Sequence, residues 1–344
     1  MKLLRQILYP ISFIYGQIIR FRNKCYDKGI WTSTTFAIPN IVVGNLNTGG
    51  TGKTPHVEYL INLLQKNFKV AVLSRGYKRK SSGFLIADKK ATARTIGDEP
   101  MQYHLKFKKL IVAVDSDRAH GLNQLKKIKN EPDLVILDDA YQHRRVHSKI
   151  NILLTSYNDL YIDDKMLPTG NLREMPKNAR RATHIIVTKC PLDLSAEKQL
   201  EIREKLRPNS NQKLYFTGIK YKDFIRNTTS KKQLKELVNK KILLVTGIAN
   251  PNPLKAYLSQ QKINYTHLKY KDHHQFSDKE ISIIENKANT LDAPLILTTE
   301  KDYVRAFIGL KNVFYLPIEI VFLLDAKDFN NEIIDYVEKS TRDS

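Results

Sequence analysis

The segment that most constrains the fold of this 344-residue chain runs from residue 41 to residue 64. It begins with the β-branched residues Ile41–Val43, which predict the end of a buried strand. A glycine-rich turn closing in Gly52-Lys53-Thr54 follows, and the apolar residues after it have helical spacing. Strand, glycine-rich turn and helix in this order are typical of a phosphate-binding loop, because backbone N–H groups and the helix N-terminus converge on an anion there.

Eight consecutive residues of this turn are predicted to bind a nucleotide. Lys53 would reach the β- and γ-phosphates, and the Thr54 hydroxyl would hold Mg²⁺. Asn47 stands where the general pattern has a glycine, and asparagine adopts left-handed backbone angles more readily than most residues. The alternative is an ordinary glycine-rich turn, which the order of the flanking elements disfavours. The predicted nucleotide-binding residues are Asn47, Thr48, Gly49, Gly50, Thr51, Gly52, Lys53 and Thr54.

Short β-branched runs alternate with helical segments through the next 150 or so residues. Such a succession predicts an α/β fold with a doubly wound, mostly parallel sheet, like that of phosphate-loop NTPases, and ligands at the carboxyl ends of the strands. The expected strands are 70–73, 110–114, 134–137, 150–154 and 184–188, and the expected helices are 56–66, 101–106 and 119–127.

A second alternation predicts a smaller α/β domain near the C-terminus, after a basic and polar stretch at 215–240. Its expected strands are 242–246, 265–269, 294–298 and 313–316, with helices at 253–260 and 278–287. We therefore expect four parts: an N-terminal helix with its lead-in at 1–36, a phosphate-loop core domain at 37–215, the smaller domain with its linker at 216–326, and a closing helix and tail at 327–344.

The first 26 residues contain no acidic residue, and their apolar residues recur at helical spacing between basic ends. Pro10 and Gly16 interrupt the apolar run, which is too short and mixed for a spanning helix of about 20 apolar residues. A secretory signal would need a small-residue cleavage site, which is lacking. We expect a helix lying in the membrane interface. A helix packed on the protein's own core is the alternative.

Net charge points to an anionic partner. Lys and Arg number 57 against 35 Asp and Glu, which gives a net charge of +22. Such a chain is attracted to nucleic acid, an anionic membrane surface or phosphorylated substrates. The two cysteines, Cys25 and Cys190, form no metal-ligand pattern and indicate a reducing compartment without a disulfide.

Two carboxylates end the apolar run Leu134–Leu137, and this position suits a metal site. In phosphate-loop proteins the second Mg²⁺ contact arises there, so Thr54, Asp138 and Asp139 are the predicted metal ligands. The polar and basic set at 142–145 is able to bind a substrate phosphate.

Two further polar motifs leave alternatives open. Asp98 and Glu99 precede a helix, where each serves either as a base for a substrate hydroxyl or as a helix cap. His273 and His274 follow Asp272, which suits an acid–base partner or a solvated surface better than a metal pair.

Taken in order, these motifs resemble those of the tetraacyldisaccharide 4′-kinases, over nearly the whole chain. The motifs that carry the resemblance are Gly44-Asn45, Gly49–Pro55, Ser74–Tyr77, Gly97–Pro100, Asp138-Asp139, Gln142–Arg144, Leu167-Pro168, Gly170, Leu172–Glu174, Asp272-His273 and Thr299–Asp302.

The resemblance implies a kinase of lipid A and lipopolysaccharide biosynthesis on the cytoplasmic face of the bacterial inner membrane. It would transfer the γ-phosphate of ATP-Mg²⁺ to the 4′-hydroxyl of an acylated glucosamine disaccharide 1-phosphate. Asp98 matches the family's catalytic carboxylate and His273 the partner that orients it. The residues that match its substrate contacts are Arg75, Tyr77, Arg118, Gln142, His143 and Arg173. The implied partners are ATP, this lipid and the anionic membrane surface, without nucleic acid and with no expectation of oligomeric state.

Three rival functions are disfavoured by the sequence. A GTPase switch would need a guanine-reading Asn-Lys-x-Asp motif, whereas residues 188–191 read Thr-Lys-Cys-Pro. A nucleic-acid-binding ATPase would show basic residues interleaved with aromatic ones on one face, and here the charge is spread. A peripheral membrane scaffold would have no need of Lys53.

Overall fold

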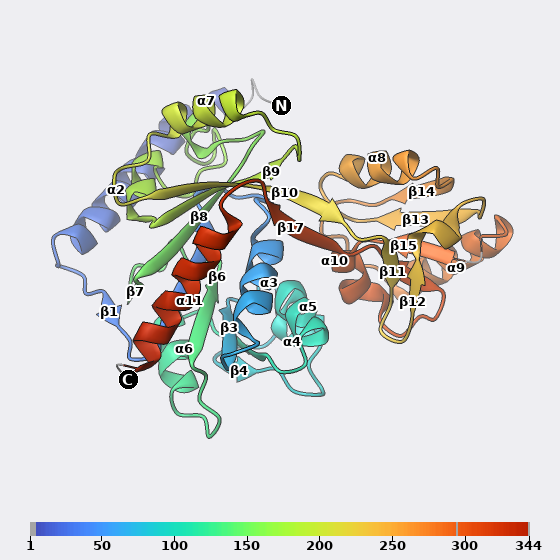
Figure 1. The fold of residues 1–344 in the computed structure, drawn as a ribbon, viewed down its shortest axis with the longest axis horizontal. Helices are drawn as coiled ribbons and strands as arrows, with labels where there is room; N and C mark the ends of the chain where they lie inside the picture. Colours follow the sequence, from blue (N-terminus) through green and yellow to red (C-terminus); the bar gives the residue numbers. More distant parts are fainter. Residues whose placement is uncertain (1–4, 294, 343–344) are drawn as a thin grey trace.

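A computed structural model of the chain describes residues 5–293 and 295–342, and it contains two main sheets (Figure 1). The larger has nine strands in the order β17-β10-β9-β8-β2-β6-β3-β5-β4, and the smaller has six in the order β12-β11-β16-β15-β13-β14. The chain leaves the larger sheet through β10 (Lys213–Tyr221) and returns through β17 (Ile318–Phe322), which pairs antiparallel with β10.

The seven interior strands of the larger sheet are all parallel, as the sequence predicts. The short edge strand β4 (Leu85–Ile86) runs antiparallel to β5. Besides β10, the parallel strands are β2 (Asn40–Asn45), β3 (Val70–Ser74), β5 (Ile111–Val114), β6 (Leu134–Asp138), β8 (Ile150–Ser156) and β9 (His184–Cys190). A separate two-stranded pair joins β1 (Thr34–Thr35) to β7 (Val146–His147).

Helices cover both faces of the larger sheet, because its strands are apolar on both sides. In β2, Ile41 and Val43 face one core and Val42 faces the other. The first core includes residues of α3 (Lys53–Leu64), α5 (Asp98–Lys106) and α11 (Ala326–Arg342), and the second includes residues of α6 (Arg118–Leu125) and α7 (Ala196–Leu206). The fold is therefore doubly wound, as expected. Short helical turns in its connections are α4 (Ala93–Ile96), η1 (Tyr161–Asp163) and η2 (Pro176–Arg181).

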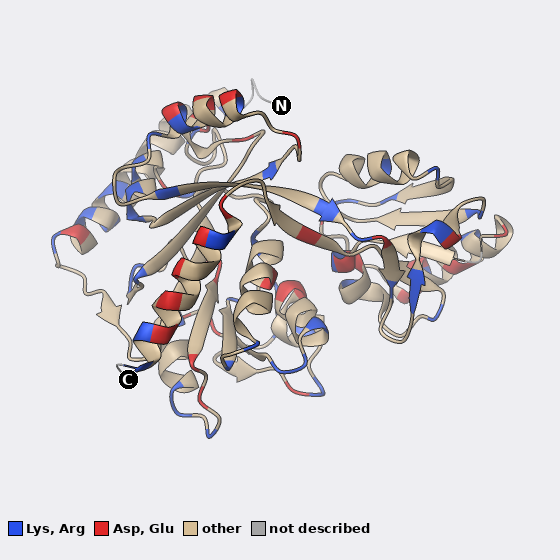
Figure 2. Cartoon of the chain, viewed as in Figure 1, with Lys and Arg blue, Asp and Glu red and all other residues tan. Residues whose placement is uncertain are grey.

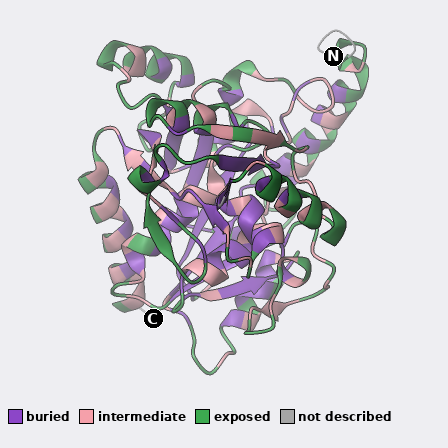
Figure 3. Cartoon of the chain, turned by 90° about the vertical axis from the view of Figure 1, so that its right-hand side faces the viewer, coloured by how far each residue is buried: buried purple, intermediate pink, exposed green. Residues whose placement is uncertain are grey.

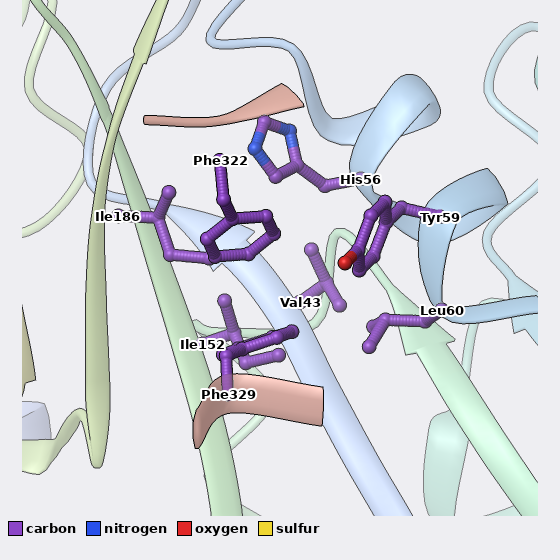
Figure 4. A pocket seen from close by; sticks show the side chains of 8 residues that line it. All are labelled: Val43, His56, Tyr59, Leu60, Ile152, Ile186, Phe322 and Phe329. Atoms are coloured by element: carbon purple, nitrogen blue, oxygen red, sulfur yellow. The ribbon is translucent and has the colours of Figure 1, made fainter. Parts of the chain in front are cut away.

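The C-terminal segment packs directly on the helix that follows the glycine-rich turn. Figure 4 shows Phe322 of β17 and Phe329 of α11 close to Val43 of β2 and Leu60 of α3. The two phenylalanine ring centroids are 4.8 Å apart, and the space left among these side chains is about 10 Å³. Close packing of this kind ties the end of the chain to the centre of the larger sheet.

The smaller sheet also carries helices on both faces. Leu254 of α8 packs on one side, and Ile284 of α9 packs on the other together with Phe307. The elements are β11 (Phe224–Arg226), β12 (Lys231–Gln233), η3 (Leu234–Leu237), β13 (Ile242–Thr246), α8 (Asn252–Gln260), β14 (Tyr265–Lys269), α9 (Asp278–Thr290), β15 (Leu295–Thr298), α10 (Glu300–Asp302), η4 (Tyr303–Phe307) and β16 (Val313–Tyr315).

The domain limits expected at residues 36, 215 and 326 stay predictions. Residue 215 lies inside β10, so a cut there would divide a strand of the larger sheet. The expected smaller domain at 216–326 also includes β17, which belongs to the larger sheet. Limits near residues 222 and 317 agree better with the strand pairing.

Helix α2 (Tyr9–Asp27) turns its apolar face outward (Figure 3). Its buried face consists mostly of small or polar residues, including Ser12, Gly16 and Asn23. Helix α2 does pack on the protein, as the alternative expects, but through this face, and its apolar stripe faces outward. No helix in the described part of the chain is both long enough and apolar enough to cross a bilayer. Large apolar residues that are 54–74% exposed here are Ile7, Tyr9, Ile11, Phe13, Ile14, Ile18 and Phe21.

Candidate functional site

The glycine-rich turn occupies residues 46–52, between the end of β2 and the first residue of α3. Gly52 caps α3 with φ of 84°, a left-handed conformation that residues with a side chain rarely adopt. Asn47 does not use such a conformation, so the reason expected for its presence is wrong. Its side chain is 3% exposed, and its backbone forms an antiparallel bridge with Leu172.

A second loop, residues 165–174, braces the glycine-rich turn. The backbone N–H of Thr48 donates to the Asn171 carbonyl at 2.7 Å, and that of Arg173 donates to the Leu46 carbonyl at 2.8 Å. Glu174, fully buried at the end of this loop, accepts a hydrogen bond from Asn23 of α2 at 2.9 Å. The turn is therefore held from the side of the N-terminal helix.

Lys53 lies in a polar network at the carboxyl ends of β2 and β6. Its Nζ is 3.3 Å from Asn45 Oδ1 and 3.6 Å from Asp139 Oδ1. Arg173 donates to the same two oxygen atoms, at 2.6 Å each. Burial opposes the charge of Asp139, but Lys53 and Arg173 outweigh it and lower the pKa of this carboxyl to about 2.

Asp138 has a different environment. Its side chain is buried, and its Oδ2 accepts only long hydrogen bonds, from Ser74 at 3.3 Å and from Tyr103 at 3.4 Å. Burial and then the neighbouring charge of Asp139 raise the pKa of Asp138 to about 6. A nearby cation would stabilise its charged form.

The oxygen atoms at this sheet edge fit a divalent cation bound together with a nucleotide. Two carboxylates and the hydroxyl of Thr54 are hard oxygen donors of the kind that Mg²⁺ prefers. Within the described ranges, no cluster of three or more His, Cys, Asp or Glu forms a complete metal cage. A Mg²⁺ ion that is bound with a nucleotide takes one or two carboxylates and completes its shell with phosphate oxygens and water.

Asp98 is the first residue of α5, and its partner comes from the far side of the interface between the two sheets. Its Oδ2 accepts a hydrogen bond from Nε of Arg305 at 2.8 Å. The neighbouring Glu99 forms an ion pair with Lys301 at 3.2 Å. The N-cap of α5 is Gly97, so Asp98 stands in the first turn of the helix and not at its cap position.

His273 lies in the same interface, but in the described part of the chain it forms no hydrogen bond or ion pair with Asp98. Its Nε2 is 3.3 Å from Lys301 Nζ, and its ring centroid is 6.3 Å from that of Tyr77. Burial and then Lys301 lower the pKa of His273. Arg305 therefore takes the place beside Asp98 that the sequence suggests for His273. His274 points elsewhere and pairs with Glu280 at 2.8 Å.

The predicted substrate-binding residues differ in their exposure to solvent and in the groups that they contact. Arg75 and Tyr77, in the loop after β3, are exposed. Gln142 donates to the Asn45 carbonyl at 2.6 Å, and Arg173 belongs to the Lys53 network. Burial, followed by Arg118 and Arg75, lowers the pKa of His143 to about 4.

Arg118 is buried and supports the ends of two strands. Its Nη1 donates to the Asp115 carbonyl at 2.7 Å, and its Nη2 donates to the Asp138 carbonyl at 3.0 Å. Only 1% of its surface is exposed. Arg118 thus holds the backbone carbonyl of Asp138, next to the carboxylate pair Asp138-Asp139, in place.

Asn45 and Arg305 were missed by the sequence predictions. Asn45 is a polar residue at the end of a buried strand, which is a usable signal, and it links Lys53 to Arg173. Arg305 stands three residues after Asp302, a helical spacing that suggests their ion pair at 3.0 Å. No pattern in the sequence relates Arg305 to Asp98.

The sequence of the chain is similar to those of known tetraacyldisaccharide 4′-kinases. The sequence model described as tetraacyldisaccharide-1-P 4′-kinase matches residues 4–338. The tetraacyldisaccharide 4′-kinase of Flavobacterium johnsoniae is 48% identical over 342 residues, covering 99% of each chain. That of Bacteroides thetaiotaomicron is 45% identical, over 98% of this chain and 94% of the relative.

The crystal structure of the apo form of LpxK from Aquifex aeolicus in complex with ATP has a similar fold. Its TM-score is 0.79 at 29% sequence identity, and the match covers 97% of this chain and 99% of that one. The protein described here belongs to the tetraacyldisaccharide 4′-kinase family.

Proposed function

We propose that this chain transfers the γ-phosphoryl group of ATP to the 4′-hydroxyl of a tetraacylated glucosamine disaccharide 1-phosphate, a precursor of lipid A. The observation that carries the proposal is the polar network at one edge of the larger sheet. There Lys53, Arg173 and the pair Asp138-Asp139 lie together beside the glycine-rich turn. Phosphoryl transfer depends mainly on positioning and charge neutralisation, which these groups supply.

Residues 47–54 would bind ATP, the phosphoryl donor. Their backbone N–H groups and Lys53 would bind the nucleotide phosphates. Thr54, Asp138 and Asp139 would hold Mg²⁺, which neutralises charge on the phosphate oxygens. Arg173 keeps Asp139 oriented through its two hydrogen bonds, at 2.6 and 3.3 Å.

Asp98 would act on the acceptor hydroxyl. The 4′-oxygen forms a bond to the γ-phosphorus while the bond from that phosphorus to ADP breaks, and the hydroxyl proton passes to the carboxylate of Asp98. Arg305 binds Oδ2 of Asp98, which orients Oδ1 for the acceptor.

Closure between the two sheets would complete this site. His273 and Arg305 belong to the part of the chain that carries the smaller sheet, whereas Asp98 and Lys53 belong to the larger one. Closure at this interface would bring His273 toward Asp98 and would exclude water from the reacting groups.

The outward apolar face of α2 would carry the protein to its lipid substrate. Its exposed isoleucine and phenylalanine side chains would enter the acyl boundary of the cytoplasmic face of the inner membrane. The chain's net charge of +22 would favour this anionic surface. Figure 2 shows Lys and Arg along this helix, beside the larger sheet.

The proposal is tested with γ-³²P-ATP, Mg²⁺ and the purified disaccharide 1-phosphate in mixed micelles. Label should appear in the lipid, on the 4′-oxygen, and should not appear with Thr54→Ala at the same Mg²⁺ concentration. Hydrolysis of ATP without labelled lipid would contradict the proposal.

A further inference from the structure

The carboxyl group of Asp302, the last residue of α10, is fully buried, and the proposed function gives it no role. Aspartate is rarely buried to this extent unless other groups compensate its charge. The partners of Asp302 therefore indicate what its burial achieves. They lead to two parts of the candidate site, Arg305 and the turn that carries His273.

Both carboxylate oxygens of Asp302 accept hydrogen bonds. Oδ2 accepts one from the backbone N–H of Gly247 at 2.9 Å and one from the Thr299 hydroxyl at 2.7 Å. Oδ1 accepts one from Nη1 of Arg305 at 3.0 Å. Gly247 follows β13, and Arg305 lies in η4. The carboxylate thus joins separate segments of the part of the chain that carries the smaller sheet.

The contact with Gly247 leads to the turn that carries His273. The carbonyl of Gly247 accepts a hydrogen bond from the backbone N–H of His273 at 3.1 Å. His273 has φ of 58°, a left-handed conformation that is strained for a residue with a side chain and needs support from its surroundings. Nη1 of Arg305 adds to this support, since it also donates to the His274 carbonyl at 3.4 Å. Asp302 therefore holds this turn through two of its partners.

The contact with Arg305 leads to Asp98. The guanidinium of Arg305 lies between two carboxylates, with Nη1 bound to Asp302 and Nε 2.8 Å from Oδ2 of Asp98. The Arg305 side chain is 1% exposed, and its Nη2 finds no acceptor within the described ranges. A buried guanidinium depends on nearby negative charge, which the two carboxylates supply.

Apolar packing surrounds the pair of Arg305 and Asp98. Met101 of α5 and Phe307 of η4 are buried in one apolar core, and each stands within three residues of a member of the pair. Helix α5 contacts both α10 and η4. A charge-assisted hydrogen bond at such a buried position is strong and sets the geometry of both partners.

We infer that Asp302 is a positioning residue for phosphoryl transfer, which holds Arg305 and the His273 turn as one unit against Asp98. The inference rests on the proposed function, in which Asp98 accepts the proton of the acceptor hydroxyl. When Asp98 takes this proton it loses its negative charge, and Arg305 becomes a buried cation with one partner fewer. The carboxylate of Asp302 still compensates that cation, so Arg305 stays in place until Asp98 releases the proton.

The test compares Asp302→Asn with wild type, with Mg²⁺-ATP and the disaccharide 1-phosphate in mixed micelles. Asparagine keeps the size of the side chain but removes its charge, so Arg305 is held less firmly and kcat should fall at least about tenfold. KM for ATP should stay within about twofold of wild type, because the partners of Asp302 lie outside the glycine-rich turn. Asp278→Asn, at an exposed aspartate of α9, should have the kcat of wild type.

A purely structural role of Asp302 would give a different pattern of losses. In the Asp98→Asn background, which lacks the proton acceptor, Asp302→Asn should lower the residual kcat by less than about threefold, because residues that act as a unit are not additive. A structural role would lower kcat by the same factor in both backgrounds. Leu258→Ala, in the other core of the smaller sheet, should lower Tm but leave kcat within about twofold of wild type below that Tm.

Gly247→Ala tests the same contact without removing a charge. The added Cβ would stand 3.0 Å from Oδ1 of Asp302, the oxygen that binds Arg305. This variant should lower kcat at least about threefold. It takes the place of Asp302→Asn in both backgrounds if thermal unfolding shows that Asp302→Asn is not folded.

The outcomes separate this inference from the proposed function. A wild-type protein that labels no lipid, or an Asp98→Asn variant with the kcat of wild type, would overturn the function or the part of Asp98 in it. With Asp98 confirmed, a smaller loss of kcat in folded Asp302→Asn than the one expected would overturn the positioning role alone. A loss in the Asp98→Asn background as large as that in wild type would overturn it equally.

Discussion

Asp138 and Asp139 are neighbours in the chain, yet their carboxyl groups have opposite pKa shifts. Asp138 is enclosed at the end of β6, so burial and the charge of Asp139 raise its pKa to about 6. Asp139 turns toward Lys53 and Arg173, which lower its pKa to about 2 against the effect of burial. Since two close carboxylates disfavour each other's charge, the pair holds its full charge best when a cation joins it.

Among the residues of the site, Asp98 is the one at which replacing a carboxylate oxygen should reduce kcat most. Replacement by asparagine preserves its size but removes the proton acceptor, so kcat for Asp98→Asn should fall at least about a hundredfold. Initial rates at saturating ATP and acceptor measure this effect. Asp88→Asn, at an exposed aspartate, is the matched control, and a kcat within a few fold of wild type in Asp98→Asn would remove Asp98 from this role.

A buried histidine, His56, holds the N-terminal end of α3 next to the glycine-rich turn. His56, one turn into the helix, is 2.7 Å from the Gly52 carbonyl through Nδ1 and 3.0 Å from Thr217 Oγ1 through Nε2. The ring thus links the glycine-rich turn to β10, and Figure 4 shows it beside Phe322. Burial lowers the pKa of His56 to about 4, so the folded protein holds it neutral.

This histidine should make stability depend on pH. Its pKa is lower in the folded state than in the unfolded one, so its contribution is complete above about pH 6.5 and is lost as the pH falls toward 4. Between pH 7 and pH 5 the loss amounts to about 2 kcal/mol. The fall in unfolding free energy over this range should therefore be smaller by about that amount in His56→Gln. Urea unfolding measures it, with the exposed His147→Gln as the control; an unchanged fall in His56→Gln would contradict the assignment.

Helix α2 should lose its affinity for membranes when its outer face becomes charged. Ile11 and Ile18 are 54% and 60% exposed, so the double substitution Ile11→Glu/Ile18→Glu leaves the protein's own packing intact. Burial of each isoleucine in lipid contributes on the order of 1–2 kcal/mol, so binding to vesicles should fall more than tenfold. Sedimentation measures it, and Ile283→Glu, at a 53% exposed position on α9, should bind like wild type. Unchanged binding of the double variant would show that α2 is not the anchor.

At the scale of the whole molecule, buried ionic groups join the two sheets. Nζ of Lys106 lies 2.8 Å from Glu58 and 3.1 Å from Glu300, which belong to α3 and α10. Burial and then the charge of Glu58 raise the pKa of Glu300 to about 7. Together with the pair of Arg305 and Asp98, this cluster fixes how the smaller sheet sits on α5.

Removal of the Lys106 ammonium group, which Glu58 and Glu300 share, should therefore destabilise the contact between the two sheets. Lys106→Met removes the cation beside two buried carboxylates, of which Glu58 still accepts a hydrogen bond from Gln102 at 2.9 Å, and should lower the free energy of unfolding by about 3–5 kcal/mol. The triple variant Lys106→Met/Glu58→Gln/Glu300→Gln should recover more than half of this loss, because no buried charge remains. Denaturant unfolding measures both, and a triple variant no more stable than the single one would contradict a charge-based origin.

Much of the larger sheet follows from local sequence. Runs such as Leu134–Leu137 are apolar on both faces, and a strand of this kind is stable only between two layers of helices. The turn before Lys53 is similarly predictable, since its glycines and its flanking elements lie within about 25 residues of one another. The conformation of Asn47 was wrongly predicted because Leu172, a distant residue, pairs with it there.

What this sequence determined by itself was the order of its elements, the phosphate loop and the acidic pair, because their periodicity and composition act over short stretches of chain. Only the tertiary structure decided that Arg305 stands beside Asp98 and that Asn45 links Lys53 to Arg173. Side chains more than 100 residues apart meet through the packing of whole layers, and no local pattern records which atoms then come within hydrogen-bonding distance.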